Sequence, residues 1–415
     1  MIALDLSRLL SRARYTTPTG IDRVEMAYAR YLVSRGGTFC FAARNARCGI
    51  GLLPAELAAE FIERLVALWR DGMGAREQRQ LIVFSHRLRL AALFGEGALR
   101  AALSDADGPI YVSVSQQHLD KAGPIARLKR ATGARFLCLI HDLIPLDFPE
   151  LTRPRQTRRH QRRLAAVAAH ADAIIANSEA TRDAIVRRLS CETIPIVAAP
   201  LAADRPHPVR LPSRRHPYFV CLGTIERRKN HDLLLTVWKR LSHELGDAAP
   251  HLLLIGRRGF GAEQITTCLG ALDGLVTECP DLSDSAVSHL LRSARAMLLP
   301  SVAEGFGLPV VEALAVGVPV LCSNLPALRE AGADVPEYLD PANTTAWHHA
   351  VVDYVDDTPR REAQLARLAC WHPPSWAEHF VIVEQLIAGL NASHPGIASC
   401  RRDRAAQPRL ASILQ

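Results

Sequence analysis

The sequence predicts an α/β protein with two successive domains of similar size, each built on a mostly parallel sheet. Short apolar runs alternate with amphipathic, helix-like stretches along most of the 415 residues, and this alternation is typical of parallel strands covered by helices. It stops at a proline-rich stretch near residue 200 and then starts again. With 48% hydrophobic residues, the chain is long enough to bury two cores.

Residues 1–203 are expected to form the first domain. Its apolar runs predict strands at Ile2–Leu6, Gln80–Phe84, Ile110–Val114, Phe136–Ile140 and Ala173–Ala176. The stretches between them predict helices, for example Ile21–Ser34, Gly123–Thr132 and Gln156–Ala169. No GxGxxG motif follows the first strand, where Ser7–Leu9 stands, so a dinucleotide-dependent oxidoreductase is not favoured.

A linker is expected at residues 204–216. Five prolines lie between residues 200 and 217, with four arginines among them. Proline at this density can continue neither a helix nor a central strand. The stretch therefore predicts the boundary between the domains.

Residues 217–373 are expected to form the second domain. Strands are predicted at Tyr218–Leu222, His251–Ile255, Ala296–Pro300 and Pro319–Cys322, and helices at Asp232–Leu245 and Pro309–Val316. Residues 374–390 predict a further helix with Ser375 as its N-cap, and the polar, arginine-rich residues 391–415 predict a disordered tail. Ligands of open α/β sheets bind beyond the carboxyl ends of the strands, so the cleft between the domains is the expected binding site.

The net charge of +8 is compatible with nucleic acid, an anionic membrane or a phosphorylated ligand as the partner. One basic run, Arg153–Arg163, holds six arginines and no aromatic residue. Binding of single-stranded nucleic acid favours aromatic side chains among the basic ones, so no nucleic acid is expected. The run predicts contact with a lipid diphosphate or an anionic leaflet; a solvated helix face is the alternative.

The ten cysteines form no CxxC pair and no Cys/His spacing typical of zinc, which indicates a reducing compartment and no metal site. The chain has no run of 18 apolar residues, and Arg8 follows Met1–Leu6 too soon for a signal peptide. A cytoplasmic protein is expected, one that can touch the inner face of the membrane peripherally.

The segment Glu304–Pro309 follows a predicted strand and precedes a predicted helix. Its two glycines, Gly305 and Gly307, indicate a backbone that approaches another group closely or needs positive φ. Pro309 suits the first position of a helix, and Gly317 suits its end. The free backbone N–H groups at such a helix N-terminus favour a phosphate.

Glu304 and Glu312 flank this segment, with Glu312 expected in the first turn of the helix. A carboxylate can accept two hydrogen bonds side by side, which suits the vicinal hydroxyls of a sugar. One glutamate can therefore hold a hexose and the other a ribose. The alternative is that Glu312 only stabilises the helix dipole and Glu304 is solvated.

A second candidate segment, Gly223–Asn230, follows the strand Tyr218–Leu222 and contains three consecutive cations, Arg227, Arg228 and Lys229. At the carboxyl end of a strand they would neutralise a diphosphate. A solvated basic turn is the alternative.

The Glu-x7-Glu spacing of Glu304 and Glu312, with Gly-Phe-Gly-Leu-Pro inside it, strongly resembles the retaining glycosyltransferases of family 4. Leu222–Asn230 resembles the family's phosphate-binding turn, with Arg227 where proline is usual. Other segments that resemble the family are Leu254–Gly256, His141–Pro145, Asn177–Glu179 and Thr19–Val24, the last resembling mannosyl- and rhamnosyltransferases of polysaccharide assembly. The resemblance covers roughly residues 2–390.

The resemblance implies a GT-B architecture: two Rossmann-like domains face each other across a cleft, and a C-terminal helix crosses back to the first domain. It implies transfer of a hexose from a nucleotide sugar, expected to be mannose from GDP-mannose, to a glycan acceptor expected to be lipid-linked, in surface polysaccharide biosynthesis. UDP-glucose or a deoxysugar nucleotide as donor, or a GT-B sugar-nucleotide epimerase, are the alternatives. No metal or other cofactor is expected, because Arg, Lys and a helix N-terminus can neutralise the leaving diphosphate.

The resemblance also implies roles for single residues. The residues implied in catalysis are Glu304 at the transferred sugar, His141 beside donor and acceptor, and Arg228 and Lys229 at the leaving diphosphate. The residues implied in donor binding are Gly20, Gly223, Arg228, Lys229, Gly305, Phe306, Gly307 and Leu308, with Glu312 on the ribose. For His141, a purely structural hydrogen bond is the alternative, and Asp142 has the simpler role of capping the next turn.

Overall fold

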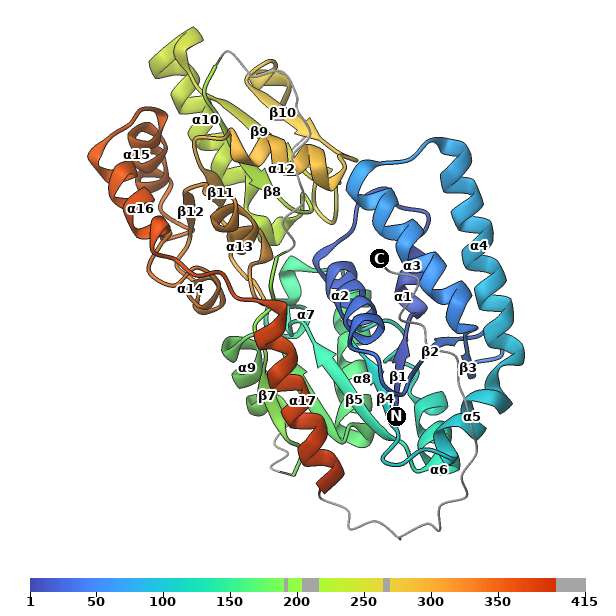
Figure 1. Cartoon of the computed structure of the whole chain (residues 1–415). Helices are drawn as coiled ribbons and strands as arrows, with labels where there is room; N and C mark the ends of the chain where they lie inside the picture. Colours follow the sequence, from blue (N-terminus) through green and yellow to red (C-terminus); the bar gives the residue numbers. More distant parts are fainter. Residues whose placement is uncertain (190–192, 204–215, 264–268, 393–415) are drawn as a thin grey trace.

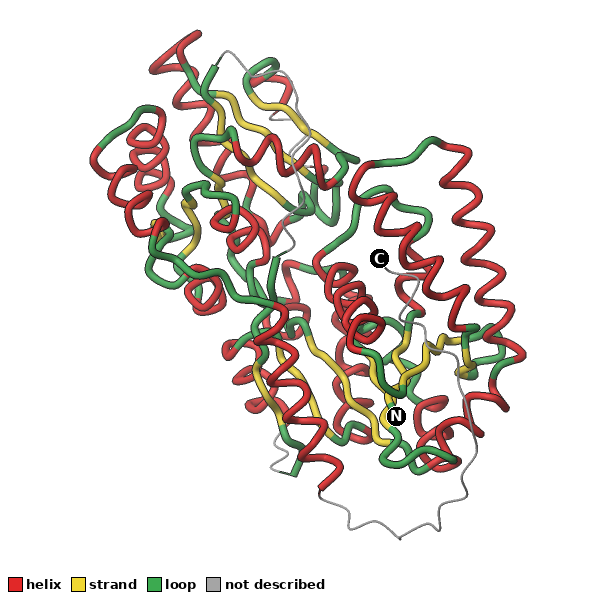
Figure 2. The backbone as a smooth tube through the Cα atoms, viewed as in Figure 1, coloured by secondary structure: helices red, strands yellow, loops and turns green. Residues whose placement is uncertain are grey.

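The computed structural model describes residues 1–189, 193–203, 216–263 and 269–392. These residues form two α/β domains, each with one sheet enclosed by helices (Figures 1 and 2). The two Rossmann-like domains predicted from the alternation of strands and helices are confirmed. The expected linker, except His216, and the expected tail, except residues 391 and 392, lie outside the described residues.

The first sheet has the strand order β3-β2-β1-β4-β5-β6-β7, and β3 alone is antiparallel to its neighbour. Its strands are β1 (Ile2–Asp5), β2 (Phe39–Arg44), β3 (Ile50–Leu52), β4 (Ile110–Ser113), β5 (Arg135–Ile140), β6 (Ala173–Ala176) and β7 (Ile196–Ala198). The second sheet has the order β10-β9-β8-β11-β12-β13 and is parallel throughout. Its strands are β8 (Tyr218–Leu222), β9 (His251–Ile255), β10 (Val276–Cys279), β11 (Met297–Leu299), β12 (Val320–Ser323) and β13 (Glu337–Leu339).

Successive residues of a strand point to opposite faces of the sheet, and here they pack into different core clusters. Each sheet therefore has an apolar surface on both faces, and helices cover both. On the first sheet, one face carries α2 (Gly20–Arg35), α3 (Ala55–Asp71), α4 (Ala75–Phe94) and α17 (Trp376–Ala392), and the other carries α5 (Glu96–Ser104), α6 (Gly123–Thr132), α8 (Pro154–His170) and α9 (Glu179–Leu189). On the second sheet, α10 (His231–Leu245) and α15 (Thr344–Val355) lie opposite α12 (Asp284–Arg292), α13 (Leu308–Ala315) and α14 (Pro326–Gly332). The short α1 (Ser7–Arg12) and α7 (Ile144–Asp147) follow β1 and β5.

Each sheet reverses its strand order at one place: between β1 and β4 in the first sheet, and between β8 and β11 in the second. Such a switch point leaves a crevice at the carboxyl ends of the two strands, where α/β proteins bind ligands. The fold therefore offers two crevices, one in each domain.

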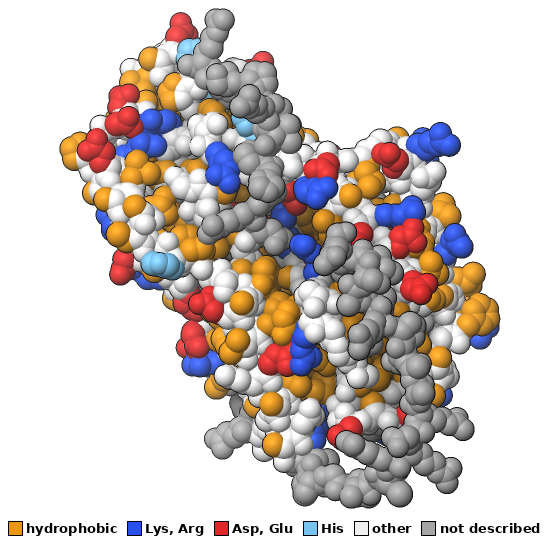
Figure 3. Space-filling model, viewed as in Figure 1, with side chains coloured by type: hydrophobic (Ala, Val, Ile, Leu, Met, Phe, Trp, Pro, Cys, Tyr) orange, Lys and Arg blue, Asp and Glu red, His pale blue; other side chains and the backbone are white. Residues whose placement is uncertain are grey.

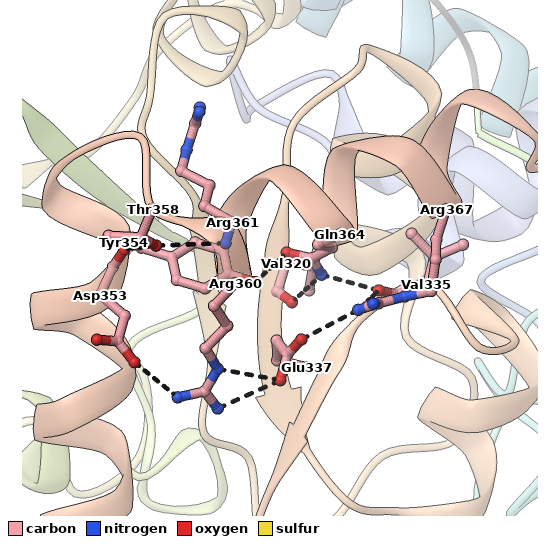
Figure 4. A network of polar contacts seen from close by, with 10 residues as sticks. All are labelled: Val320, Val335, Glu337, Asp353, Tyr354, Thr358, Arg360, Arg361, Gln364 and Arg367. Atoms are coloured by element: carbon pink, nitrogen blue, oxygen red, sulfur yellow. Dashed lines mark hydrogen bonds and ion pairs between the residues drawn. The ribbon is translucent and has the colours of Figure 1, made fainter.

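The helix α16 (Pro359–Ala369) is fixed to the second sheet by a buried polar side chain, Gln364 (Figure 4). Its amide nitrogen donates to the carbonyls of Val320 and Val335, and its oxygen accepts from Tyr354. Ion pairs around it are Arg360–Glu337, Arg360–Asp353 and Arg367–Glu337. Both ends of the buried Gln364 amide are hydrogen-bonded, so its burial leaves no polar group of this side chain unpaired. The network therefore fixes α16 to the second sheet before the chain leaves the second domain.

The C-terminal helix α17 lies on the first domain, as predicted (Figure 1). The Phe380 ring stacks on Tyr31 of α2 with centroids 3.7 Å apart, and the His379 ring bonds to the hydroxyl of Tyr28 at 2.8 Å. Ser375 accepts a hydrogen bond from the N–H of Glu378, so its predicted N-cap role is confirmed.

The predicted strand Gln80–Phe84 is wrong, because these residues belong to α4. The apolar run Leu81–Phe84 suggested a strand. However, Leu81, Phe84 and Leu88 are buried at helical spacing, whereas Val83 is 60% exposed. No glycine or proline interrupts this helix, so the run continues the helical pattern of its flanks. The strands β2, β3, β7, β10 and β13 were not predicted.

No helix among the described residues is long and apolar enough to cross a membrane. The described cysteines are all free, and Cys138 and Cys221 are buried within strands. They pack as small apolar side chains.

Candidate active site

A cavity of about 450 Å³ lies between the two domains. Its walls are the segments that follow β1, β5, β6 and β7 in the first domain and β8, β9, β10 and β11 in the second. Basic and acidic side chains gather where the domains meet (Figure 3). All the predicted site residues line this one cavity: Gly20, His141, Gly223, Arg228, Lys229, Glu304, Gly305, Phe306, Gly307, Leu308 and Glu312.

Glu304 is the most strongly bonded carboxylate of the cavity. One oxygen accepts from Lys229 Nζ at 2.5 Å and from Ser301 Oγ at 2.7 Å, and the other accepts from Arg228 Nη1 at 2.8 Å. Only 7% of its side chain is exposed. Burial raises the pKa of Glu304, but Arg228 and Lys229 outweigh this effect and lower it to about 2. The carboxylate is therefore ionised at any physiological pH.

Arg228 and Lys229 are already paired with carboxylates, whereas the sequence suggested cations available to a diphosphate. Both bond to Glu304, and Arg228 also donates to Glu226 through Nε at 2.6 Å. Two cations thus face two carboxylates, and the group holds no excess positive charge. Lys229 still has donor hydrogens that Glu304 does not use, because an ammonium has three.

The two glycines of the loop after β11 have different purposes. A Cβ at Gly305 would lie 2.1 Å from the carbonyl oxygen of His141, so this residue lets the loop touch the first domain. The carbonyl of Gly305 also accepts from Ser178 and Thr181 of that domain, at 2.6 and 3.0 Å. Gly307 is the N-cap of α13 and has φ of 105°, which an L side chain rarely adopts. The predicted close approach and positive φ are both confirmed.

The helix α13 begins at Leu308, so Pro309 is its second residue and Glu312 its fifth. The expectation that Glu312 lies in the first turn is therefore wrong: it lies at the start of the second turn. Its role as a dipole-stabilising residue weakens accordingly, because that effect is confined to the first turn. Glu312 Oε1 instead lies 3.4 Å from Arg23 Nε of the first domain.

Arg23 joins the two domains across the mouth of the cavity. Its two terminal nitrogens donate to Asp284 at 2.9 and 2.6 Å, and Asp284 is the first residue of α12. A Cβ on Gly20, one turn earlier in α2, would lie 3.1 Å from Leu308 Cδ1. The start of α2 is thus packed against the N-termini of α12 and α13. Sequence reasoning quoted Arg23 only as part of a motif and missed this contact.

His141 follows β5 and is buried, with Nε2 2.8 Å from the carbonyl oxygen of Val114. A carbonyl only accepts, so Nε2 carries the hydrogen and Nδ1 is left as an acceptor. Burial lowers the pKa of His141 to about 4, and the ring is neutral near pH 7. The structural hydrogen bond is present, and the ring also lines the cavity. Asp142 caps the next turn by accepting from the N–H of Ile144 at 3.1 Å.

Several further residues that line the cavity were not predicted: Arg8, Arg12, Asn177, Arg257, Asp281 and Asp284. Each lies within a few residues of the carboxyl end of a strand, and that position was the available signal. Among the described residues, no group of three His, Cys, Asp or Glu side chains could hold a metal ion.

Comparison with protein families gives two matches. Residues 216–357 match the model described as "Glycosyl transferases group 1", and residues 120–199 match "Glucosyltransferase 3-like, N-terminal domain". The first match spans all the strands of the second sheet, β8 to β13, and the second match spans β5, β6 and β7 of the first sheet.

Two bacterial mannosyltransferases are similar in sequence. O-antigen chain mannosyltransferase B of Escherichia coli is 29% identical over 254 residues, which cover 58% of this chain and 65% of that protein. O-antigen chain mannosyltransferase RfbU of Salmonella typhimurium is 28% identical over 139 residues, which cover 32% of this chain and 37% of that protein. The chain thus resembles bacterial mannosyltransferases, although it spans less than two thirds of the relatives' own length.

Solved structures share the fold along nearly the whole chain. Sucrose-phosphate synthase of Thermosynechococcus elongatus has a TM-score of 0.64 at 17% identity, covering 95% of this chain and 99% of that one. WaaG, a glycosyltransferase involved in lipopolysaccharide biosynthesis, has a TM-score of 0.58 at 14% identity, covering 95% and 98%. The predicted GT-B fold is confirmed.

Proposed function

We propose that this chain is a retaining glycosyltransferase that moves a hexose from a nucleotide sugar to a glycan acceptor in surface polysaccharide biosynthesis. One observation supports this most: Glu304 is held ionised by Lys229 and Arg228 in the interdomain cavity, beside the N-terminus of α13. The match to the glycosyl transferase model covers these residues.

The donor diphosphate would lie at the N-terminus of α13. The backbone N–H groups of Phe306, Gly307 and Leu308 stand there, and Arg228 and Lys229 are within reach from the turn after β8. Departure of a nucleoside diphosphate builds negative charge on its oxygens, and these fixed donors would stabilise that charge. We therefore propose that transfer requires no metal ion.

The two glutamates would hold the two sugars of the donor. Glu304 would contact the transferred hexose and support the positive charge that develops on it. Glu312 would bond the ribose, with Arg23 beside it fixing the direction of its carboxylate. His141 would orient the hexose and the acceptor hydroxyl as a neutral hydrogen-bonding group.

Mannose from GDP-mannose is our first choice of donor, because the mannosyltransferases of Escherichia coli and Salmonella typhimurium are similar to 58% and 32% of this chain. UDP-glucose is the second choice: HepE of Anabaena, solved with UDP-glucose, shares the fold with a TM-score of 0.63. A deoxysugar nucleotide as donor, or an epimerase reaction, remain alternatives.

The acceptor would be lipid-linked, and the protein would then act at the cytoplasmic face of a membrane. The helix α8 supports this proposal, because three arginines at one-turn and two-turn spacing, Arg155, Arg158 and Arg162, are exposed. They would face an anionic leaflet. Arg153 is exposed too, but it lies 5.6 Å from the ring of Phe260 in the second domain.

A panel of nucleotide sugars tests the proposal. The chain would be incubated with GDP-mannose, UDP-glucose and a deoxysugar nucleotide, and the products separated. Release of nucleoside diphosphate with one donor, while the hexose passes to an added glycan acceptor or to water, supports a transferase. Conversion to an isomeric nucleotide sugar supports the epimerase instead, and no binding of any donor contradicts both.

A further inference from the structure

The cations of the second domain that line the interdomain cavity are balanced by acids. Arg228 and Lys229 face the carboxylates of Glu226 and Glu304. Asp142 adds an acid to the same cavity wall, although burial raises its pKa. The diphosphate of a nucleotide sugar is anionic, and its charge grows as the hexose leaves. The N-terminus of α13 offers it only a partial positive charge, so further positive charge is needed.

The ion pairs at the mouth of the cavity do not supply this charge. Arg257, after β9, is paired with Asp281 at 2.5 Å. Arg23 of the first domain meets two acids of the second domain, Asp284 and Glu312. Within the described residues, the first of these groups is neutral and the second is negative. Neither would attract a diphosphate by its net charge.

Among the described residues that line the cavity, one ion-paired group has more cations than acids, and it belongs to the first domain. Arg8 and Arg12 of α1 both pair with the carboxylate of Asp22, at 2.5 and 2.9 Å. Asp22 is fully buried and also accepts from the N–H and the hydroxyl of Thr19, at 2.7 and 2.8 Å. The two arginine side chains are only 19% and 14% exposed. One positive charge is therefore held away from water without a counter-charge, and an anionic ligand would stabilise it.

This charge lies near the start of α13. Arg8 Nη2 donates to the hydroxyl of Thr19 at 3.0 Å. A Cβ on the next residue, Gly20, would lie 3.1 Å from Leu308 Cδ1, and Leu308 is the first residue of α13. The charge of Arg8 also acts on His141, whose pKa is lowered mainly by burial and to a lesser degree by Arg8. Arg8 is therefore close to the places proposed for the diphosphate and for the hexose.

Arg8 keeps a donor for a ligand, whereas Arg12 is held on two sides. The Arg12 guanidinium pairs with Asp22 and lies over the ring of Tyr15, 3.9 Å from its centroid. Arg8 uses Nε on Asp22 and Nη2 on Thr19, and its Nη1 makes no hydrogen bond within the part of the chain that the structure describes. Because two of its nitrogens are fixed, the planar guanidinium is already oriented before a ligand binds.

We propose that Arg8 binds the diphosphate of the nucleotide sugar from the side of the first domain, at the phosphate that carries the hexose, and is a further catalytic residue of the transfer. Arg228 and Lys229 are matched by carboxylates, so Arg8 supplies the excess positive charge that stabilises the leaving diphosphate. A hydrogen bond between two charged groups is also about twice as strong as a neutral one. This inference rests on the proposed function, because the diphosphate belongs to the donor of that reaction.

Calorimetry with a nucleoside diphosphate and the matching monophosphate tests the proposal. The pair is GDP and GMP, or UDP and UMP if the chain binds uracil nucleotides instead. We expect Arg8→Gln to weaken binding of the diphosphate at least about tenfold, the loss of one charge-assisted hydrogen bond. The monophosphate should lose much less affinity, because it lacks the phosphate that Arg8 contacts. Equal losses for both nucleotides, or no loss for the diphosphate, would overturn the inference.

Arg14→Gln is the matched control. Arg14 lies just after α1, is exposed and does not line the cavity. This variant should bind both nucleotides as the unmodified protein does, and a loss equal to that of Arg8→Gln would contradict a direct contact.

Arg8→Lys tests the charge itself. Lysine keeps the positive charge, so this variant should recover part of the affinity for the diphosphate that Arg8→Gln loses. If Arg8→Lys bound as weakly as Arg8→Gln, the role of the charge would be wrong. Arg8→Met, which keeps most of the packing volume, replaces Arg8→Gln if the latter does not fold.

Transfer assays separate the donor from the acceptor. Arg8→Gln should lower kcat about a hundredfold, the effect of removing one donor from developing negative charge, and should leave the KM of the acceptor unchanged. A raised KM of the acceptor with unchanged affinity for the nucleotide would mean that Arg8 binds the acceptor, and would overturn the inference.

The outcomes distinguish this inference from the proposed function. If neither GDP nor UDP binds to the unmodified chain, both are contradicted. If a nucleoside diphosphate binds equally to the unmodified chain and to Arg8→Gln, only the role of Arg8 is wrong.

Discussion

Lys229 and Glu304 form an ion pair, 2.5 Å between Nζ and Oε1, in which neither side chain is more than 7% exposed. The pair joins the turn after β8 to the loop after β11, across the switch point of the second sheet. Breaking a buried pair from one side leaves the other charge uncompensated. Lys229 therefore has two roles, one in stability and one in the reaction.

We expect Lys229→Ala to lower both the turnover and the stability of the protein. Turnover should fall by about 10² to 10³, the usual effect of removing one donor from developing negative charge. The free energy of unfolding should fall by about 3 kcal/mol, because Glu304 loses a buried partner. Kinetics and denaturant unfolding measure the two effects, with the exposed Lys239→Ala as control. Near-normal turnover in a destabilised variant would leave Lys229 with a structural role only.

The pKa of Glu304 predicts how stability depends on pH. The pKa is about 2 in the folded chain against an ordinary 4.5, so the ionised carboxylate stabilises the fold above pH 4.5, and the gain is lost as pH falls towards 2. The contribution is on the order of 3 kcal/mol. The difference in unfolding free energy between the unmodified chain and Glu304→Gln should therefore shrink between pH 5 and pH 3. A difference independent of pH in that window would contradict the ion-pair account.

Arg23 should couple the closure of the two domains to nucleotide binding. Arg23→Gln removes two hydrogen bonds to Asp284. It also removes the positive charge beside the Glu312 carboxylate. We expect nucleotide affinity to fall several-fold, since a half-buried ion pair is worth about 1 kcal/mol. Calorimetry on Arg23→Gln, Asp284→Asn and the double variant measures the coupling. Additive losses would show that the two side chains act independently.

The exposed arginines of α8 should bind anionic vesicles. Each is worth about 1 kcal/mol near a charged leaflet, so replacing Arg155, Arg158 and Arg162 by Gln should weaken binding by about a hundredfold. The control replaces three exposed arginines of α4, Arg76, Arg79 and Arg87. Co-sedimentation decides: equal binding to neutral and anionic vesicles by the unmodified chain would rule the membrane contact out.

The sequence predicted the site better than it predicted the contacts within it. Gly305 and Gly307 were predictable, because a close approach and a positive φ each require glycine. The bonds from Arg228 and Lys229 to Glu304 were not, since they join residues 75 and 76 positions apart, and periodicity carries no information on such pairs.

Errors in the fold have similar physical causes. Gln80–Phe84 is apolar enough for a strand, and only its position in a long uninterrupted helix decides against it. Glu312 was placed in the first turn because Pro309 was taken for the first residue of the helix, whereas the helix starts at Leu308, directly after Gly307. Boundaries of this kind depend on the cap, which periodicity does not reveal.

The most direct test compares Glu304→Gln with Glu312→Gln. Both replacements keep the shape of the side chain and remove its charge. We expect Glu304→Gln to lower kcat at least about a hundredfold with little change in the Kd of the nucleotide, and Glu312→Gln mainly to raise that Kd. If both variants changed only affinity, Glu304 would not take part in transfer, and the proposed division between the two glutamates would be wrong.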